Sequence, residues 1–221
     1  MEVTFLDILN TLKRGAFETI KILPLCMLSI LITGTILGAI QSKKIPVVKY
    51  LISGYIIIMR GIPILVVIIV FFFALNINDQ FIAAVMALSI YHIGYITEIV
   101  RGGIEAIPKG QFEAAESLGL SNFKIMTKVI IPQIWYQIIP ALAGQYIILA
   151  KDTSLLSAIG IREILWSGRQ LMKITFKPFQ IFFLIGVFFY VICFSLQQIS
   201  IWAEKLFERK FVNSGGEHNE G

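Results

Sequence analysis

Charged residues are scarce in this sequence. Asp, Glu, Lys and Arg make up 15% of its 221 residues, whereas 57% are hydrophobic and the mean hydropathy is +0.80. A typical soluble domain carries about 25% charged residues, so this composition excludes an ordinary soluble globule. A helix needs about 20 apolar residues to cross a bilayer, and uncharged runs near that length are present. The composition therefore predicts an integral membrane protein.

Cysteine and histidine are also rare. Cys26 and Cys193 lie far apart inside apolar runs, which predicts small buried hydrophobes and no disulfide framework. His92 is the one histidine in an apolar run, so we expect hydrogen-bonded packing and no ligand. The chain has no His-Glu-x-x-His sequence, and Asp79 and Asp152 fall outside the centres of the apolar runs. We therefore expect no catalytic residues and no metal site, which excludes an intramembrane protease.

Five apolar segments are long enough to cross a membrane: residues 18–42, 50–77, 80–106, 123–151 and 178–207, with approximate ends. They lack the alternation of barrel strands, and backbone groups in lipid must be paired internally, so helices are predicted. No cleavage pattern follows the first segment, which is expected to remain. The fold class is all-α integral membrane, with one domain over 1–211 and a disordered polar tail over 212–221.

Five crossings would place the two termini on opposite sides. If the C-terminus is cytoplasmic, that side carries ten Lys and Arg residues against seven, which modestly favours N-out, C-in. The seven on the other side are Lys13, Arg14, Lys21, Arg162, Arg169, Lys173 and Lys177. These juxtamembrane cations account for the net charge of +5. No basic stripe with interleaved aromatics is visible outside the spans, so no nucleic acid partner is expected.

The loop between the third and fourth spans reads "FEAAESLGLSNFKIMTKVIIPQ" from Phe112 to Gln133. Pro108 and Gly110 are expected to end the preceding helix, and a short helix is predicted over 111–119. Gly119 provides a left-handed stop for that helix. A helix of this length is unstable alone, so it needs a partner surface. The alternative is a solvated loop with an interfacial helix.

The chain continues from this helix towards the fourth span. Ser121 is placed to cap a second helix. Pro132 is expected to limit or kink that helix before the span begins.

"EAAESLGLSNFKIMTKVIIP" resembles the EAA signature of ABC importer permeases, with Val129 and Ile131 where that family usually has Ile and Leu. Further stretches resemble the polar amino acid class of these permeases: "RGIPIL" at 60–65, "YITEIVRGGIEAIPKGQ" at 95–111, "KDTSLLSAIGIREI" at 151–164 and "FKPFQIF" at 176–182. Together these stretches cover most of the chain from residue 60 onward.

The resemblance implies a five-transmembrane-helix type I ABC importer permease core with a short cytoplasmic coupling helix. It also implies a second permease subunit, identical or related, an ABC ATPase dimer that binds the loop, an extracytoplasmic amino-acid-binding protein, and a prokaryotic inner membrane. A cytoplasmic loop fixes the N-terminus outside. The chain has no Walker A sequence, so ATP and Mg are expected on the partner ATPase and no cofactor on this chain. The implied ATPase-coupling residues are Glu113, Ala114, Ala115, Glu116, Leu118, Gly119, Lys124 and Pro132.

Ionisable side chains within spans are costly and tend to be functional or paired. The candidates for a substrate pathway are Arg60, Glu98, Arg101, Gln145, Lys151, Asp152, Thr153, Ser154 and Glu163. Glu98 and Arg101 share a helix face, which predicts an ion pair. Glu98 and Glu163 are candidate partners for a substrate amino group. Packing or gating is the alternative for these residues, and snorkelling for Arg60 and Arg101.

Gly34 and Gly38 form a Gly-x-x-x-Gly step, which lets another helix approach closely. Packing within the subunit is favoured over dimerisation. The function that follows from all of these features is the translocation subunit of an ATP-driven importer for polar amino acids. A stand-alone secondary transporter or channel for small polar solutes is the alternative.

Overall fold

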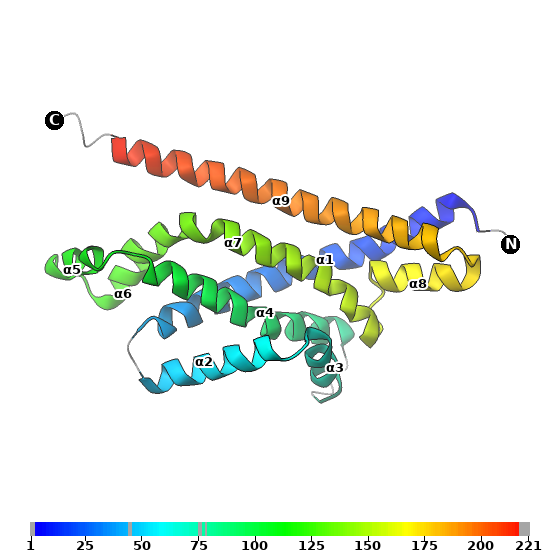
Figure 1. Cartoon of the computed structure of the whole chain (residues 1–221), viewed down its shortest axis with the longest axis horizontal. Helices are drawn as coiled ribbons and strands as arrows, with labels where there is room; N and C mark the ends of the chain where they lie inside the picture. The colour runs from blue at the N-terminus through cyan, green and yellow to red at the C-terminus, as the bar shows by residue number, and fades with distance from the viewer. Residues whose placement is uncertain (1–2, 44–45, 75–76, 78, 217–221) are drawn as a thin grey trace.

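The computed structural model describes residues 3–43, 46–74, 77 and 79–216, without the side chains of 136 and 207–216. Every element within these residues is helical. In chain order the elements are α1 (Phe5–Gln41), α2 (Pro46–Gly61), α3 (Ile64–Ala74), α4 (Gln80–Glu105), α5 (Lys109–Ser117), α6 (Asn122–Lys124), π-helix η1 (Ile125–Ile130), α7 (Ile131–Asp152), 3-10 helix η2 (Thr153–Ile159), α8 (Ile164–Thr175) and α9 (Pro178–Gly216). The long helices follow one axis, and the two termini lie at its opposite ends (Figure 1).

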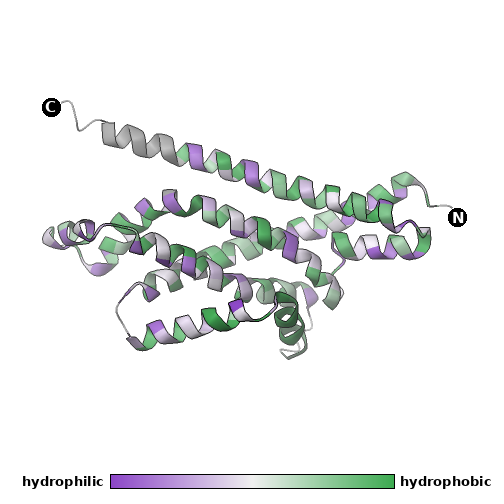
Figure 2. Ribbon diagram, in the orientation of Figure 1, coloured by the Kyte–Doolittle hydropathy of each residue, from purple (hydrophilic) through white to green (hydrophobic). Residues whose placement is uncertain are grey.

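Three of the helices, α1, α4 and α9, are each long and apolar enough to cross a membrane. Two bent pairs meet the same criteria: α2 with α3, bent by 108°, and the segment from Asn122 to Ile159, bent by 68°. The predicted run over 50–77 is therefore broken within its length, since α2 ends at Gly61. Pro63 explains the break, because it lacks an N–H and disfavours helical geometry at Ile62. Figure 2 shows α3 and α9 as largely hydrophobic.

The packing of α1 on α4 uses the Gly-x-x-x-Gly step. A Cβ on Gly34 would lie 2.6 Å from Cγ2 of Ile96, and one on Gly38 would lie 2.8 Å from Cβ of Val100. Only glycine leaves room for this approach, since real Cβ contacts are longer. The step thus serves packing within the subunit, as predicted.

A second, smaller core lies at the N-terminal end of the molecule. Ile8 and Leu12 of α1, Ile164 and Leu171 of α8, and Ile181 of α9 are buried together there. We call this unit the α8 bundle: residues 5–20 of α1, all of α8 and residues 178–187 of α9.

Both long helices extend beyond their predicted bounds. α1 begins at Phe5, well before the expected start near 18, because Thr4 and Asp7 form a capping box. Its 37 residues reach about 55 Å, more than a 30 Å hydrocarbon core requires. α9 continues to Gly216, so residues 212–216 of the expected tail are helical, and 217–221 lie outside the described residues.

Candidate functional site

The short helix α5 projects at the end of the molecule opposite the α8 bundle (Figure 1). It starts at Lys109, two residues before the predicted start near Gln111. Pro108 occupies the N-cap position, with φ −57° and ψ 137°, where its missing N–H leaves no hydrogen bond of the helix unmade. Gly110 falls in the first turn of α5 and does not interrupt it. The preceding helix, α4, already ends at Glu105.

The end of α5 agrees with the prediction. Gly119 adopts φ +72°, the left-handed region that suits glycine. Its N–H donates to the Glu116 carbonyl at 2.9 Å, and the Leu120 N–H donates to the Ala115 carbonyl at 3.3 Å. These two bonds form a Schellman motif. Beyond it, the Ser121 hydroxyl accepts from the Lys124 N–H at 3.5 Å, so the predicted cap is present.

The predicted coupling residues divide into an inward and an outward set. Ala115 is 4% exposed and faces the core of its own chain. The exposed members are Glu113, Ala114, Glu116, Leu118, Gly119, Lys124 and Pro132.

Two large apolar side chains stand out at this polar end of the molecule. Leu118 is 79% exposed and Phe123 is 74% exposed. The sequence analysis did not select Phe123, although an aromatic residue two positions after the Ser121 cap in a polar loop was a usable signal. Exposed apolar side chains of this kind indicate a protein contact surface.

The connection from α6 into α7 is a π-helix, Ile125–Ile130. Pro132 explains it, because its missing N–H leaves the Lys128 carbonyl without a donor and its ring crowds that carbonyl. The wider π turn relieves the crowding. Pro132 therefore does interrupt the helix before the fourth span, as predicted.

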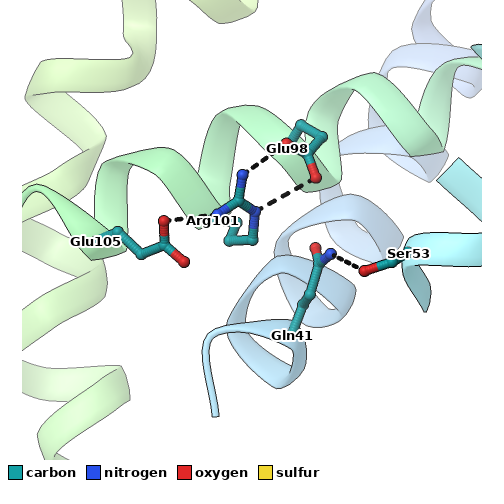
Figure 3. A network of polar contacts seen from close by, with 5 residues as sticks. All are labelled: Gln41, Ser53, Glu98, Arg101 and Glu105. Atoms are coloured by element: carbon teal, nitrogen blue, oxygen red, sulfur yellow. Dashed lines mark hydrogen bonds and ion pairs between the residues drawn. The ribbon is translucent and has the colours of Figure 1, made fainter. Parts of the chain in front are cut away.

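A polar stripe runs along α4. It consists of Tyr91, Tyr95, Glu98, Arg101 and Glu105, which recur every three or four residues and so share one helix face. The Arg101 guanidinium contacts Glu98 at 2.8 Å and Glu105 at 2.6 Å. Figure 3 shows both pairs, so the predicted Glu98–Arg101 pair is confirmed and Glu105 extends it.

Two neighbouring helices approach the stripe. The Arg60 guanidinium at the end of α2 lies 5.3 Å from the Tyr95 ring centroid, a cation–π distance. Nearby, the Gln41 amide of α1 donates to the Ser53 hydroxyl of α2 at 3.1 Å (Figure 3). Side chains of α1 and α2 therefore lie beside the stripe of α4.

His92 is fully buried beside the stripe and joins two predicted pathway residues. Its Nδ1 lies 2.7 Å from Nε2 of Gln145, and its Nε2 lies 3.3 Å from Oδ2 of Asp152. Because the Gln145 amide donates, the proton of a neutral His92 sits on Nε2, facing Asp152. His92 is therefore buried and hydrogen-bonded, as predicted. No local signal could have found these contacts, because the partners are 53 and 60 residues away.

Glu163 has a different setting from Glu98. It is 0% exposed, and its carboxylate oxygens accept from the N–H groups of Leu165 and Trp166, both at 2.7 Å, which caps α8. Burial raises the pKa of Glu163 to about 7, although the two N–H donors favour its ionised form. The contacts with α1 show how far apart the two carboxylates lie. The backbone of Glu163 lies beside Gly15, whereas the backbone of Thr97, the residue before Glu98, lies beside Gly38. Twenty-three residues of α1 separate these levels, about 34 Å, so the two carboxylates do not share one site.

The remaining pathway candidates lie at the end of α7. The Thr153 hydroxyl is buried and donates to the Ala150 carbonyl at 2.7 Å. Lys151 is exposed and Ser154 is half-buried. The structure therefore gathers five candidates around α4: Arg60, Glu98, Arg101, Gln145 and Asp152.

A row of ionisable and polar side chains inside a bundle of apolar helices is typical of a membrane transport protein. Residues 30–210 match the family described as binding-protein-dependent transport system inner membrane component, and the chain belongs to this family.

Its relatives include the L-cystine permease TcyB of Bacillus subtilis (strain 168), 30% identical over 90% of this chain and 87% of that protein. The arginine permease ArtQ of the same organism is 31% identical over 91% of this chain and 92% of that protein. The crystal structure of an amino acid ABC transporter with histidines superposes with a TM-score of 0.79 at 29% identity, covering 93% of this chain and 99% of that one. The resemblance to amino acid ABC permeases is confirmed.

Proposed function

We propose that this chain is the translocation subunit of an ATP-driven importer for polar amino acids, paired with a second permease subunit and with an ATPase dimer. The relatives named for cystine and arginine support the substrate class. The observation that carries the coupling to an ATPase is α5, a nine-residue helix that projects from the molecule and leaves Leu118 and Phe123 exposed. Such a surface needs a partner to cover it.

In this mechanism α5 is the coupling helix. Residues 106–108 join it to α4, and α6 with η1 joins it to α7. A displacement of α5 by the ATPase is therefore transmitted to the two helices that carry the stripe and its Gln145 and Asp152 neighbours. ATP and Mg belong to the ATPase, and this chain contributes the contact surface and the pathway.

The topology follows from the same contact. We place α5 in the cytoplasm, with five crossings of the inner membrane when each bent pair counts as one. The C-terminal end of α9 lies at the α5 end of the molecule and the N-terminus at the other (Figure 1). This arrangement gives N-out, C-in, which agrees with the charge count.

The stripe of α4 is the proposed substrate pathway. An amino acid zwitterion needs an anionic and a cationic partner. Glu98 and Asp152 provide carboxylates, and Arg60 provides a guanidinium that forms no ion pair within the described residues. Arg101 is held between two carboxylates, which suits it to gating.

The pathway is tested by Glu98→Gln. We expect uptake to fall at least fivefold, because the variant removes one carboxylate and frees Arg101. Glu18→Gln, an acid in the α8 bundle, is the control. Unchanged affinity and rate in Glu98→Gln would remove the stripe from the pathway.

The coupling is tested by ATP-driven uptake with the ABC ATPase that co-purifies with this chain. Glu113→Lys and Phe123→Glu are expected to reduce ATP-driven uptake at least tenfold while the protein still reaches the membrane. Lys49→Glu, an exposed charge reversal on α2, is the control. Uptake by the isolated chain in proteoliposomes without an ATPase would favour a stand-alone transporter instead.

A further inference from the structure

A stripe of basic and aromatic side chains runs along the side of α8 away from the core. Trp166, Arg169 and Lys173 follow at intervals of three and four residues, the spacing of one helix face, and Arg162 lies just before the N-cap residue Glu163. The other side of α8 is buried through Ile164, Ser167, Gly168 and Leu171. The expectation that no basic stripe with interleaved aromatics exists outside the spans is therefore wrong at this helix.

Hollows lie on both sides of Trp166. One, of about 550 Å³, is lined by Lys13 and Arg14 of α1 together with Arg162. The other, of about 580 Å³, is lined by Arg169 and Lys173. We call the surface formed by Lys13, Arg14, Arg162, Trp166, Arg169 and Lys173 the α8 face.

The cations of the α8 face lack acidic partners. None of the five forms an ion pair with a side chain that the structure describes. Glu18 lines the first hollow, but it pairs with Lys21 at 2.8 Å. Glu163 is buried and caps α8, and Arg169 acts on its carboxylate only at longer range than an ion pair. The Arg162 guanidinium instead lies 5.4 Å from the Trp166 ring centroid.

The position of these charges is unusual for a membrane protein. Lys and Arg are normally enriched on the cytoplasmic side. With α5 in the cytoplasm, the α8 face is on the outer side, at the opposite end of the molecule (Figure 1). Five unpaired cations there indicate a partner that supplies the negative charge.

We propose that the α8 face is the docking surface for acidic side chains of the extracytoplasmic binding protein, which seat in the hollows on either side of Trp166. This inference rests on the proposed function. Trp and Arg are the residue types that dominate protein interfaces, and complementary charge accelerates association.

The packing around the α8 face lets docking act at a distance. α8 packs on α1 and α9 through the second core. α1 in turn packs through Gly34 and Gly38 against α4, which carries the polar stripe. A displacement of the α8 face on docking is thus transmitted along α1 to the pathway.

Anionic lipid headgroups would also neutralise cations, but the hollows favour a protein. The most exposed apolar side chains of this end, Phe176 and Phe179, belong to the turn after α8 and to the start of α9, whereas Phe17 lines the first hollow. These are the groups suited to lipid, whereas the α8 face combines hollows, charge and an aromatic ring.

The experiment measures binding of the transporter's substrate-loaded binding protein to the assembled transporter in phosphatidylcholine nanodiscs. The double variant Arg169→Glu, Lys173→Glu is expected to weaken binding at least tenfold and to flatten its dependence on salt. Trp166→Ala is expected to weaken it severalfold at every salt concentration. Lys177→Glu, a charge reversal at the same end but off the α8 face, is the control and should change affinity less than twofold.

The possible results separate the alternatives. Equal binding by the double variant and the unchanged chain overturns the inference, and the proposed function stands if the same samples hold the ATPase and show ATP-driven uptake. Binding that requires phosphatidylglycerol in the nanodisc also overturns the inference and assigns the face to lipid. A chain that assembles with no ATPase overturns the proposed function itself.

Discussion

Single polar residues inside the helix bundle are held by partners that are distant in sequence. Gln145 satisfies Nδ1 of His92, and Asp152 faces its Nε2. An unpaired polar group costs several kcal/mol in lipid, roughly, so each of these contacts constrains how α4 and α7 pack. Composition identified Gln145 and Asp152 as candidates because polar groups are rare in spans. It could not identify the partners of His92, since only the packing of two helices shows what faces its ring.

Glu163 provides a prediction about pH at the residue scale. It lies outside the spanning segments, and its pKa is raised from 4.5 to about 7 by burial. The folded state then binds a proton that the unfolded state releases, so stability is greatest below about pH 4.5 and falls as the pH rises towards 7, by about 3 kcal/mol in the limit. We expect the melting temperature of the purified protein to fall between pH 5 and pH 8.

The matched variant is Glu163→Gln, which keeps one capping oxygen but cannot ionise. Its melting temperature should be nearly independent of pH over the same range. Glu18→Gln serves as the control and should retain the pH dependence of the unchanged chain. Parallel curves for Glu163→Gln and the unchanged chain would show that the two backbone donors keep the carboxylate ionised throughout.

At the scale of elements, the existence of the helices followed from apolar length and from caps, but their breaks did not follow from hydropathy alone. The Gly119 stop and the Ser121 cap are local, and both are present. The 108° bend between α2 and α3 is caused by Pro63, yet its size depends on how α3 packs against α4. The α8 bundle was missed for a similar reason, because its core joins three segments that are far apart in sequence.

Gly119 and Gly110 give a matched pair of variants in α5. Gly119 needs φ +72°, which costs a residue with a Cβ about 1–2 kcal/mol, whereas Gly110 lies in ordinary helix with open space around it. We expect Gly119→Ala to lower amino acid uptake per ATP hydrolysed severalfold, Gly119→Trp to abolish it, and Gly110→Ala to preserve it. Equal coupling ratios in all three variants would contradict a role for the shape of α5.

The α1–α4 contact gives the second prediction at this scale. Gly38→Leu should destabilise the protein by about 1–3 kcal/mol, because its side chain would collide with Val100 and with the Thr97 carbonyl. Gly54→Leu on α2 is the control, since nothing lies within 4 Å of its Cβ position. Thermal unfolding of both variants in detergent checks this. Similar melting temperatures would place the close approach elsewhere.

The whole molecule has two chemically distinct ends joined by apolar helices. One end presents α5 with exposed acidic and apolar side chains, and the other presents the α8 face, whose cations form no ion pair within the described residues. α1 and α9 run the length between them. The charge count alone gave only a modest bias in orientation, since ten cations against seven hardly differ. The seven cations predicted for the outer side are informative for another reason, because five of them lie together on the α8 face.

Orientation is the prediction that belongs to this scale. Single cysteines at Ser121, beside α5, and at Lys173, on the α8 face, should react from opposite sides of the membrane. A background of Cys26→Ala and Cys193→Ala removes the native thiols, which lie in the spanning helices. In intact cells whose outer membrane, where present, has been made permeable, an impermeant maleimide should label Lys173→Cys at once and Ser121→Cys only after lysis. Labelling of Ser121→Cys in the intact cells would put α5 on the outer side, where no ATPase can reach it, and would remove both the coupling role of α5 and the docking role of the α8 face.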